Sequence, residues 1–498
     1  MTSMSMASRA IPRLWSLDPW RIACARRGLK SDPRSSLSSD LSEGGSCAAG
    51  EDGANNIVTL NARVLILAKE DRLAGPLAGG LDRLDWKTVT ARGPHAALAV
   101  LADLQVEAVV IDASEGEMDA FTTAARMKAA YAPRRLPILA LGAPGDAIDS
   151  GPFDLVMAPP VHASQVAMRL DAMVRLSVAE EEFDLRAATF ADRGRRLDAP
   201  VADPAPLQIL TVGEPAPKFL ALSHALRRSG AEVTGAFTAY TAFDYLHERS
   251  FDAVVLWAGE THAEALSIAS GMRRNTRLFH IPTVLYQRSG AEIGVAEAYN
   301  RGLSDIATAD TPEAETAQRV AALARSFRRE TAIRRALDKA KGSGLMDAAT
   351  GLFTRDLFAA HLSRLAKAAQ ARRRPLSVAV LRIADRPETV RLRGEGWIDR
   401  AIPQIGSMIG RLVRAEDTAA RLAPDVFALA LPAATQSAAK TAAERIAAVI
   451  ACTAFDAGDG QTPFTMDFDI GAAEVDPKES AAQALERAAA RAMTRKAS

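Results

Sequence analysis

The stretch VRAEDTAARLAPDVFALALP, from Val413 to Pro432, decides how the C-terminal third of the chain is interpreted. Two apolar segments flank Ala423-Pro424-Asp425. The stretch therefore predicts the end of a helix followed by a β-hairpin. An R-x-x-D motif, formed by Arg414 and Asp417, stands before the first predicted strand. Its role depends on the rest of the chain.

The composition is that of an ordinary soluble protein. The chain has 498 residues, too many for one core, and domains of the usual size predict three or four units. Basic and acidic residues nearly cancel, and the formal charge of +1 argues against broad attraction to DNA or to anionic membranes. No apolar run approaches the roughly 18 residues that a membrane-spanning helix needs. We therefore expect no membrane insertion, no DNA partner and a cytoplasmic location.

The cysteines and the N-terminal segment carry little chemistry. Cys24, Cys47 and Cys452 lie far apart without metal-ligand spacing, which fits a reducing compartment and predicts no metal site. Residues 1–60 include a long segment rich in Ser, Gly and Asp that cannot bury enough apolar surface to fold. We expect a disordered extension there, and an over-long gene-start assignment explains the same composition equally well.

Three short apolar runs recur at a constant offset in the first two thirds of the chain. The members of each pair are 145 positions apart: RVLIL at Arg63 and QILTV at Gln208, EAVVID at Glu107 and DAVVLW at Asp252, LPILAL at Leu136 and IPTVLY at Ile281. A constant offset over three segments indicates a duplicated domain. Segments with helical spacing lie between the buried runs, which predicts a doubly wound parallel sheet in each copy.

This strand and helix order resembles response-regulator receiver domains, which are flavodoxin-like (CheY-like). The resemblance implies a phosphoacceptor aspartate after the third strand, and Asp112 stands there in the first copy. Its supporting groups are replaced: Ala68-Lys69 stands for the acidic pair, Gly142 for the hydroxyl residue and Pro159 for the lysine. Without carboxylates to hold a cation, phosphoryl transfer loses most of its charge stabilisation. A structural leftover is favoured over a phospho-switch in which Glu70-Asp71 substitutes for the acidic pair.

The second copy departs further from the receiver pattern. The offset places Trp257 where the acceptor belongs, and Gly213 with Glu214 replaces the acidic pair. Because a tryptophan cannot accept phosphate, packing, partner binding or a spacer role in a dimer remain as its functions.

From Leu345 onward the chain resembles the GGDEF family of diguanylate cyclases, whose palm-like, nucleotidyl-cyclase-like α/β domain condenses two GTP molecules into cyclic di-GMP. MDAATGLFTRDLF matches the family's opening motif, PLSVAVLRIAD its first core strand, RLAPDVFALALP its signature hairpin and FTMDFDIGAAEV a late strand. The predicted organisation is a disordered extension (1–60), a degenerate receiver (61–176), a linker (177–206), a second degenerate receiver (207–312), a connecting helix (313–344) and a degenerate GGDEF domain (345–498).

The resemblance assigns the active-site positions, and most of them are altered. Arg382 stands where the family has a metal-binding aspartate, and Val390 where it has a guanine-reading asparagine. Ala423-Pro424 replaces the flexible Gly-Gly pair, and proline fixes φ and lacks an N–H. Asp425 and Asp399 keep acidic character. We expect no catalytic residue, no metal and no cyclisation, because one carboxylate facing an arginine cannot activate a hydroxyl for attack.

The R-x-x-D motif occupies the register of the family's product-inhibition site. The resemblance implies that Arg414 and Asp417 bind cyclic di-GMP, with Arg445 as a second arginine from AAERIAAVI. A guanidinium can donate to guanine O6 and N7 or to phosphate, while a carboxylate accepts from the guanine N–H groups. The same spacing at Arg195 and Asp198 is better explained as a helix-surface ion pair. A relic surface pair is the competing explanation at Arg414 itself.

Two degenerate receivers before a degenerate GGDEF domain resemble the PleD type of cyclase and its catalytically silent relatives. That resemblance implies a homodimeric receptor and adaptor for cyclic di-GMP, gathered at a cell pole, which helps deliver a cell-cycle regulator to a protease. Arginines from another subunit or from a receiver could complete the ligand site. The alternatives are an active cyclase, a phospho-responsive regulator acting through Asp112, and a GTP sensor at the old active site.

Overall fold

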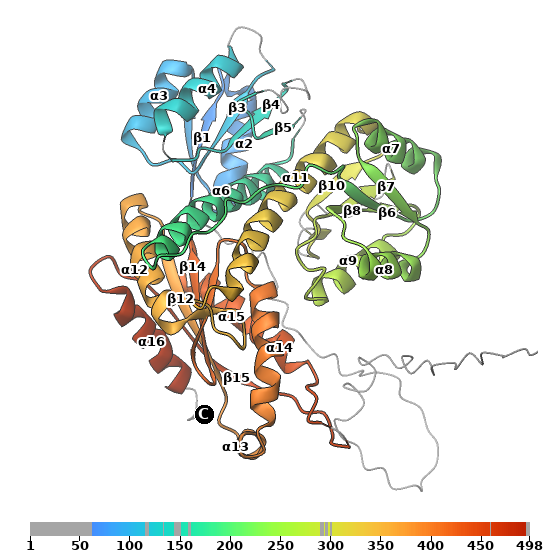
Figure 1. Cartoon of the computed structure of the whole chain (residues 1–498). Coiled ribbons are helices and arrows are strands. Elements are labelled where there is room, and N and C mark those ends of the chain that lie inside the picture. Colours follow the sequence, from blue (N-terminus) through green and yellow to red (C-terminus); the bar gives the residue numbers. More distant parts are fainter. Residues whose placement is uncertain are drawn as a thin grey trace, which may run out of the picture. The chain divides into compact units, whose positions relative to one another are not determined.

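The computed structural model describes residues 62–494, apart from 115–118, 133, 144–150, 158–160, 289–292, 294–296, 299–300 and 459 (Figure 1). The extension predicted for residues 1–60 and the predicted lysine position at Pro159 lie outside the described residues. The described part contains three five-stranded sheets, of which two are parallel and the third is mixed.

The first sheet belongs to a flavodoxin-like domain in which strands and helices alternate. Its elements are β1 (Arg63–Leu67), α2 (Asp71–Asp82), β2 (Lys87–Ala91), α3 (Pro94–Asp103), β3 (Ala108–Asp112), α4 (Ala120–Tyr131), β4 (Ile138–Leu141), β5 (Leu155–Met157) and α6 (Ala163–Ala191). The strand order is β2-β1-β3-β4-β5, and all pairs are parallel. Helices α2 and α6 cover one face, and α3 and α4 cover the other. Every residue of β3 and β4 is buried, because both faces are covered.

The second sheet repeats this architecture. Its elements are β6 (Gln208–Val212), α7 (Pro217–Arg228), β7 (Glu232–Ala236), α8 (Ala239–Glu248), β8 (Ala253–Ala258), α9 (Ala263–Arg274), β9 (Thr283–Gln287), β10 (Asp305–Thr308) and α11 (Glu313–Asp338). Its order, β10-β9-β8-β6-β7, matches that of the first sheet, and β6, β8 and β9 begin 145 positions after β1, β3 and β4. The predicted pair of doubly wound parallel sheets is confirmed, while the receiver identity of these domains stays a prediction.

The third sheet is the one that contains the hairpin. Its domain consists of η1 (Lys339–Gly342), β11 (Phe353–Thr354), α12 (Arg355–Arg372), β12 (Leu376–Ile383), α13 (Pro387–Gly394), α14 (Trp397–Leu412), β13 (Thr418–Ala423), β14 (Val426–Pro432), α15 (Gln436–Ala451), β15 (Phe468–Glu474) and α16 (Ala481–Thr494). The strand order is β11-β13-β14-β12-β15. Helix α14 ends just before the R-x-x-D motif, and β13 and β14 pair antiparallel across the turn Pro424-Asp425.

Two long helices extend from the flavodoxin-like domains into the core of the third domain. Phe183 and Phe190 of α6, together with Ile333 and Ala336 of α11, belong to the same hydrophobic cluster as α12 and the third sheet. In Figure 1, α6 runs beside α12, and the two helices are in contact. Helix α6 continues without a break to Ala191, so the domain boundary predicted between residues 176 and 177 falls inside it. Buried apolar residues follow Ser177 along the helix.

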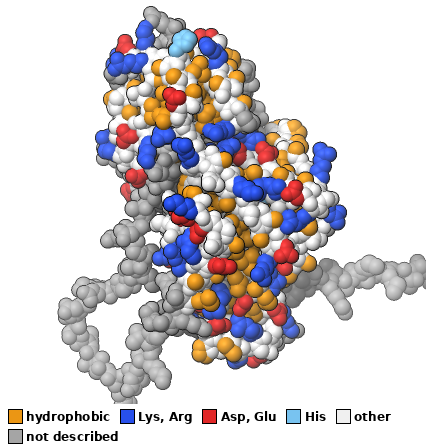
Figure 2. All heavy atoms as spheres, turned by 90° about the vertical axis from the view of Figure 1, so that its left-hand side faces the viewer, with side chains coloured by type: hydrophobic (Ala, Val, Ile, Leu, Met, Phe, Trp, Pro, Cys, Tyr) orange, Lys and Arg blue, Asp and Glu red, His pale blue; other side chains and the backbone are white. Residues whose placement is uncertain are grey.

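The surface has no belt of a single charge on the face drawn in Figure 2, where basic and acidic side chains are interspersed among hydrophobic ones. Within the described residues, no helix is both long and apolar enough to cross a membrane.

Candidate functional site

Arg414 and Asp417 lie in the loop that joins α14 to β13, residues 413–417, which we call the R-x-x-D loop. Oδ2 of Asp417 accepts a hydrogen bond from the main-chain N–H of Arg414 over 3.0 Å. The main-chain N–H of Asp417 donates to the carbonyl oxygen of Arg414 over 3.3 Å. The motif thus closes a turn on itself. None of the hydrogen bonds or ion pairs found among the described residues engages the Arg414 guanidinium, which leaves its donors available.

Arg414 lines a cavity of about 640 Å³ to which all three domains contribute. Its walls come from α6, α9, α11, the segment before β9, the R-x-x-D loop and α15, which carries Arg445. Asp417 lines a small adjoining recess together with Arg414 and Arg445. The volume falls within the range of about 300–1,000 Å³ that is usual for small-molecule sites. The three residues predicted to contact a ligand are therefore brought together.

Arginine dominates the lining of this cavity. The charged lining residues are eight arginines and three carboxylates: Arg169, Arg175, Arg273, Arg274, Arg301, Arg334, Arg414 and Arg445, with Asp171, Glu330 and Glu416. An excess of positive charge in a concave, partly buried space attracts anions.

The arginines of the cavity crowd one another. Burial, followed by the charge of Arg175, lowers the pKa of Arg414. Burial, followed by the charge of Arg414, lowers the pKa of Arg445 to about 10, and burial lowers that of Arg273 to about 10. Nε of Arg445 is buried and has no hydrogen-bond partner among the described residues. These groups remain charged at neutral pH, so a bound anion would relieve an unfavourable interaction.

Four predicted active-site positions, Arg382, Ala423, Pro424 and Asp425, lie together at one end of the third sheet. Arg382 stands opposite Val426 on one side and Asp469 on the other, and the N–H of Ile383 donates to the carbonyl oxygen of Asp425. Nη2 of Arg382 lies 3.4 Å from Oδ2 of Asp385 and 3.6 Å from Oδ2 of Asp469. Carboxylates at this end of the sheet therefore face a protein cation.

Helix α13 supplies a second cation to the same place. Nη2 of Arg393 lies 3.1 Å from Oδ2 of Asp425, the acidic residue of the turn. Val390, on the same helix, is 58% exposed. Asp399 is exposed in the first turn of α14, and no hydrogen bond or ion pair among the described residues connects it to the turn. The structure therefore brings four of the six predicted positions together, adds Arg393, and leaves Val390 and Asp399 on the surface.

Asp112 ends β3 and is 7% exposed. Its Oδ1 accepts from the main-chain N–H of Ser114 over 3.1 Å and from the Ser114 hydroxyl over 2.5 Å. Gly142 has φ of +77°, and a Cβ there would lie 2.7 Å from Cβ of Ser114. The hydroxyl beside Asp112 therefore comes from Ser114, which the sequence pattern does not single out.

No cluster of three or more His, Cys, Asp or Glu that could hold a metal occurs among the described residues.

In the second flavodoxin-like domain, aromatic side chains pack at the position that corresponds to Asp112 in the first. The ring of Trp257 stacks on Phe219 at a centroid distance of 5.6 Å and lies 5.3 Å from the ring of Tyr286. Gly213, with φ of +138°, lies directly against this tryptophan, because a Cβ there would be 2.7 Å from Cβ of Trp257. This end of the second sheet is therefore built as a packed aromatic cluster.

Comparisons with known proteins identify the third domain. Residues 344–498 match the family model described as diguanylate cyclase, GGDEF domain, so a GGDEF domain is present there. Among solved structures, the chain is similar to the GGDEF domain of FimX from Pseudomonas aeruginosa, with 23% identity over 30% of this chain and 92% of that chain and a TM-score of 0.28. It is also similar to the GGDEF domain of DgcB from Caulobacter crescentus in complex with c-di-GMP, with 25% identity, 31% and 88% coverage and a TM-score of 0.28.

A third similar structure is the diguanylate cyclase SiaD in complex with its activator SiaC from Pseudomonas aeruginosa, with 22% identity over 36% of this chain and 70% of that chain and a TM-score of 0.30. No curated protein matches the sequence.

Proposed function

We propose that the chain is a catalytically inactive GGDEF protein that binds cyclic di-GMP in the arginine-lined cavity through Arg414, Asp417 and Arg445. The observation that carries the proposal is that Arg414 and Arg445 line a cavity with eight arginines against three carboxylates, and that Asp417 lines the adjoining recess together with both of them. Guanidinium groups suit both parts of the ligand, because they bind phosphate oxygens and the O6 and N7 acceptors of guanine.

Asp417 gives the site its preference for guanine. One of its carboxylate oxygens accepts from the N–H of Arg414, which restrains the group. The other oxygen can accept from the guanine N1–H and N2–H₂ donors. A phosphate-only ligand would gain nothing from a carboxylate at this position, so the pair favours a guanine nucleotide over a simple polyanion.

The absence of catalysis is proposed from the arrangement at the turn. Arg382 and Arg393 lie against Asp385, Asp425 and Asp469, so the carboxylates that could attract a divalent cation already face cations. Pro424 fixes its own φ and has no N–H to offer a phosphate.

The wider role follows from resemblance alone. The domain order resembles that of PopA, a catalytically silent relative of the PleD-type cyclases. On that basis the protein would be a cytoplasmic, homodimeric receiver-type adaptor that gathers at a cell pole and recruits protein partners when cyclic di-GMP is bound. Ligand binding would select the domain arrangement in which the cavity is closed around the dinucleotide.

Isothermal titration of cyclic di-GMP into wild type and Arg414→Ala tests the proposal. Arg195→Ala is the matched control, because Arg195 has the same R-x-x-D spacing but is exposed. It lies past the end of α6, so the prediction that it stands on a helix surface was wrong. We expect binding by wild type and by the control, and a loss of at least about tenfold in Arg414→Ala. Equal binding by all three proteins would remove the site assignment, and no binding by wild type would remove the function.

A further inference from the structure

Arg186, on α6, is buried beneath the R-x-x-D loop. Its side chain is 1% exposed. Nη1 donates to the carbonyl oxygen of Ala415 and Nη2 to that of Asp417, each over 3.0 Å. One guanidinium thus holds two main-chain carbonyl groups of the loop, although more than 220 residues separate it from them in the sequence.

Glu182, one helical turn earlier, holds Arg186 in place. Oε1 of Glu182 accepts from Nε of Arg186 over 2.7 Å and from the Thr418 hydroxyl over 2.7 Å. Nε2 of His361, on α12, lies 3.0 Å from the same oxygen. Burial acts to raise the pKa of Glu182, but Arg186 and His361 together hold it below the usual value. The carboxylate is therefore ionised and balances the buried arginine.

A third carbonyl group of the loop is also held by an arginine from a long helix. Nη2 of Arg334, on α11, donates to the carbonyl oxygen of Val413 over 2.8 Å. Alternate carbonyl groups at Val413, Ala415 and Asp417 are thus held by arginines of α6 and α11. Because these three carbonyl groups flank Arg414 and include that of Asp417, holding them restrains the backbone from which both side chains project.

We propose that Arg186 is a positioning residue: by holding the carbonyl groups of Ala415 and Asp417, it fixes the loop so that Arg414 and Asp417 present their side chains to a guanine dinucleotide. The inference rests on the proposed function. It makes the affinity of the GGDEF domain depend on α6, a helix that begins in the first flavodoxin-like domain.

Arg186→Lys is the informative variant. A lysine keeps the charge beside Glu182 but lacks the planar fork that reaches two carbonyl groups at once. We expect the dissociation constant for cyclic di-GMP to rise by roughly tenfold, because at least one charge-assisted hydrogen bond to the loop is lost. Without ligand, amide hydrogen exchange across residues 413–418 should become faster.

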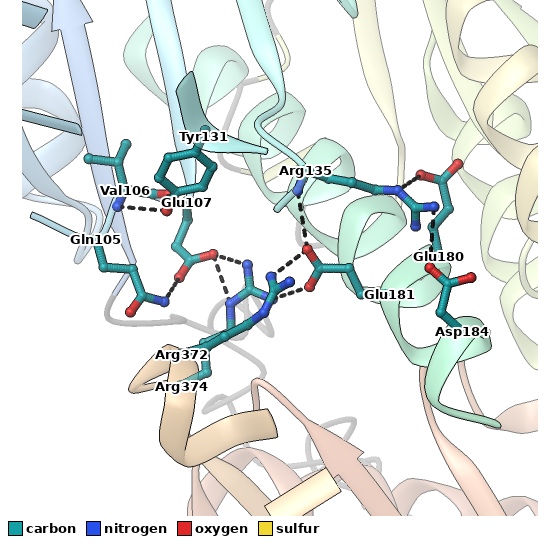
Figure 3. A network of polar contacts seen from close by, with 10 residues as sticks. All are labelled: Gln105, Val106, Glu107, Tyr131, Arg135, Glu180, Glu181, Asp184, Arg372 and Arg374. Atoms are coloured by element: carbon teal, nitrogen blue, oxygen red, sulfur yellow. Dashed lines mark hydrogen bonds and ion pairs between the residues drawn. The ribbon is translucent and has the colours of Figure 1, made fainter. Parts of the chain in front are cut away.

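Arg374→Lys is the matched control. Arg374 is a partly buried arginine, 13% exposed, that joins α6 and the first domain to the third domain, as Figure 3 shows. Its Nε donates to Oε2 of Glu107 over 2.8 Å and its Nη1 to Oε2 of Glu181 over 2.9 Å. None of the hydrogen bonds or ion pairs that it makes among the described residues reaches the R-x-x-D loop. If Arg186 only fastened the domains together, the two substitutions would have the same effect.

Both variants and wild type would be compared by titration with cyclic di-GMP and by hydrogen exchange without ligand. Weaker binding and faster loop exchange in Arg186→Lys, with neither change in Arg374→Lys, would support the positioning role. Unchanged loop exchange in Arg186→Lys, or equal changes in both variants, would overturn it.

Two further arms keep the inference separate from the proposed function. If wild type does not bind cyclic di-GMP, the proposed function fails and the exchange rates alone decide whether Arg186 fixes the loop. If Arg186→Lys does not fold, Thr418→Val replaces it, because that change removes a hydroxyl that contacts both Nε of Arg186, at 3.2 Å, and Glu182. Faster exchange at the loop in Thr418→Val supports the inference, and wild-type exchange counts against it.

Discussion

Cζ of Arg445 lies 4.8 Å from the centroid of the Phe279 ring. The arginine belongs to α15 of the GGDEF domain, and the phenylalanine to the segment between α9 and β9 of the second flavodoxin-like domain. Cζ of Arg273 lies 5.5 Å from the centroid of the same ring. A predicted ligand residue is thus held by a cation–π contact from another domain, and the contact forms one wall of the cavity.

Phe279→Leu is expected to weaken cyclic di-GMP binding modestly. The contact holds Arg445 in the cavity, and a cation–π interaction is worth about 0.5–1 kcal/mol at a partly exposed site, or roughly two- to fivefold in affinity. Phe237→Leu serves as control, because Phe237 belongs to the same domain, is 63% exposed and does not line the cavity. Titration calorimetry on the two variants checks the expectation, and an affinity equal to wild type in Phe279→Leu contradicts it.

Binding should depend on pH through Glu416, which lies in the R-x-x-D loop. Burial, followed by the charge of Asp417, raises the pKa of Glu416 to about 7, although Arg414 and Arg175 oppose the rise and Glu330 adds to it. Above this value the carboxylate is ionised and repels the phosphates of the ligand. Below it the group is neutral, so affinity should increase as the pH falls from 8 to 6, by up to about tenfold.

Titrations at pH 6, 7 and 8 on wild type and Glu416→Gln measure this dependence. The variant should bind tightly with little change over the interval, because its amide carries no charge and the arginines stay protonated. An affinity that rises with pH, or the same slope in both proteins, would refute the assignment to Glu416.

Asp112 is expected to resist phosphorylation. Its carboxylate already accepts two hydrogen bonds from Ser114, and Ala68 stands buried where an acidic metal ligand would be needed. Incubation with acetyl phosphate and Mg²⁺, followed by intact-protein mass spectrometry, should show no phosphorylated species. Asp112→Asn should leave cyclic di-GMP binding unchanged. A phosphorylated wild type that is lost in Asp112→Asn would restore the phospho-responsive alternative.

Local patterns in the sequence predict much of this fold. Continuous apolar runs form β1, β3 and β4 and their copies 145 positions later, because both faces of each sheet are covered. Such runs can be recognised in the sequence alone. The boundary inside α6 could not be found in the same way. Helix α6 changes its packing partner partway, but its helical spacing has no break that marks the place. The charged residues after Ser177 therefore look like those of a linker, although Phe183 and Phe190 pack in the third domain.

The candidate site is only partly visible in the sequence. Arg414 and Asp417 stand out because they keep a fixed spacing from the hairpin. Arg175, Arg273 and Arg334 reach the same cavity from three other helices, and no spacing relates them to the motif. Arg186 is further hidden, because a single buried arginine on a charged helix resembles a surface residue until its partners are known.

The turn at Pro424 and Asp425 provides the last prediction. Wild type should make no cyclic di-GMP from GTP and Mg²⁺, and Arg382→Asp should not restore synthesis. The substitution removes the cation next to Asp385 and Asp469 and adds a possible metal ligand, but Pro424 still fixes the turn and Arg393 still pairs with Asp425. Mass spectrometry of the reaction products, with a GGDEF cyclase that has an intact Gly-Gly turn as positive control, gives the readout. Synthesis by wild type would show that the protein is a cyclase despite Arg382 and Pro424. Synthesis by Arg382→Asp alone would mean that the arginine at position 382, and not the rigid turn, prevents catalysis by the domain.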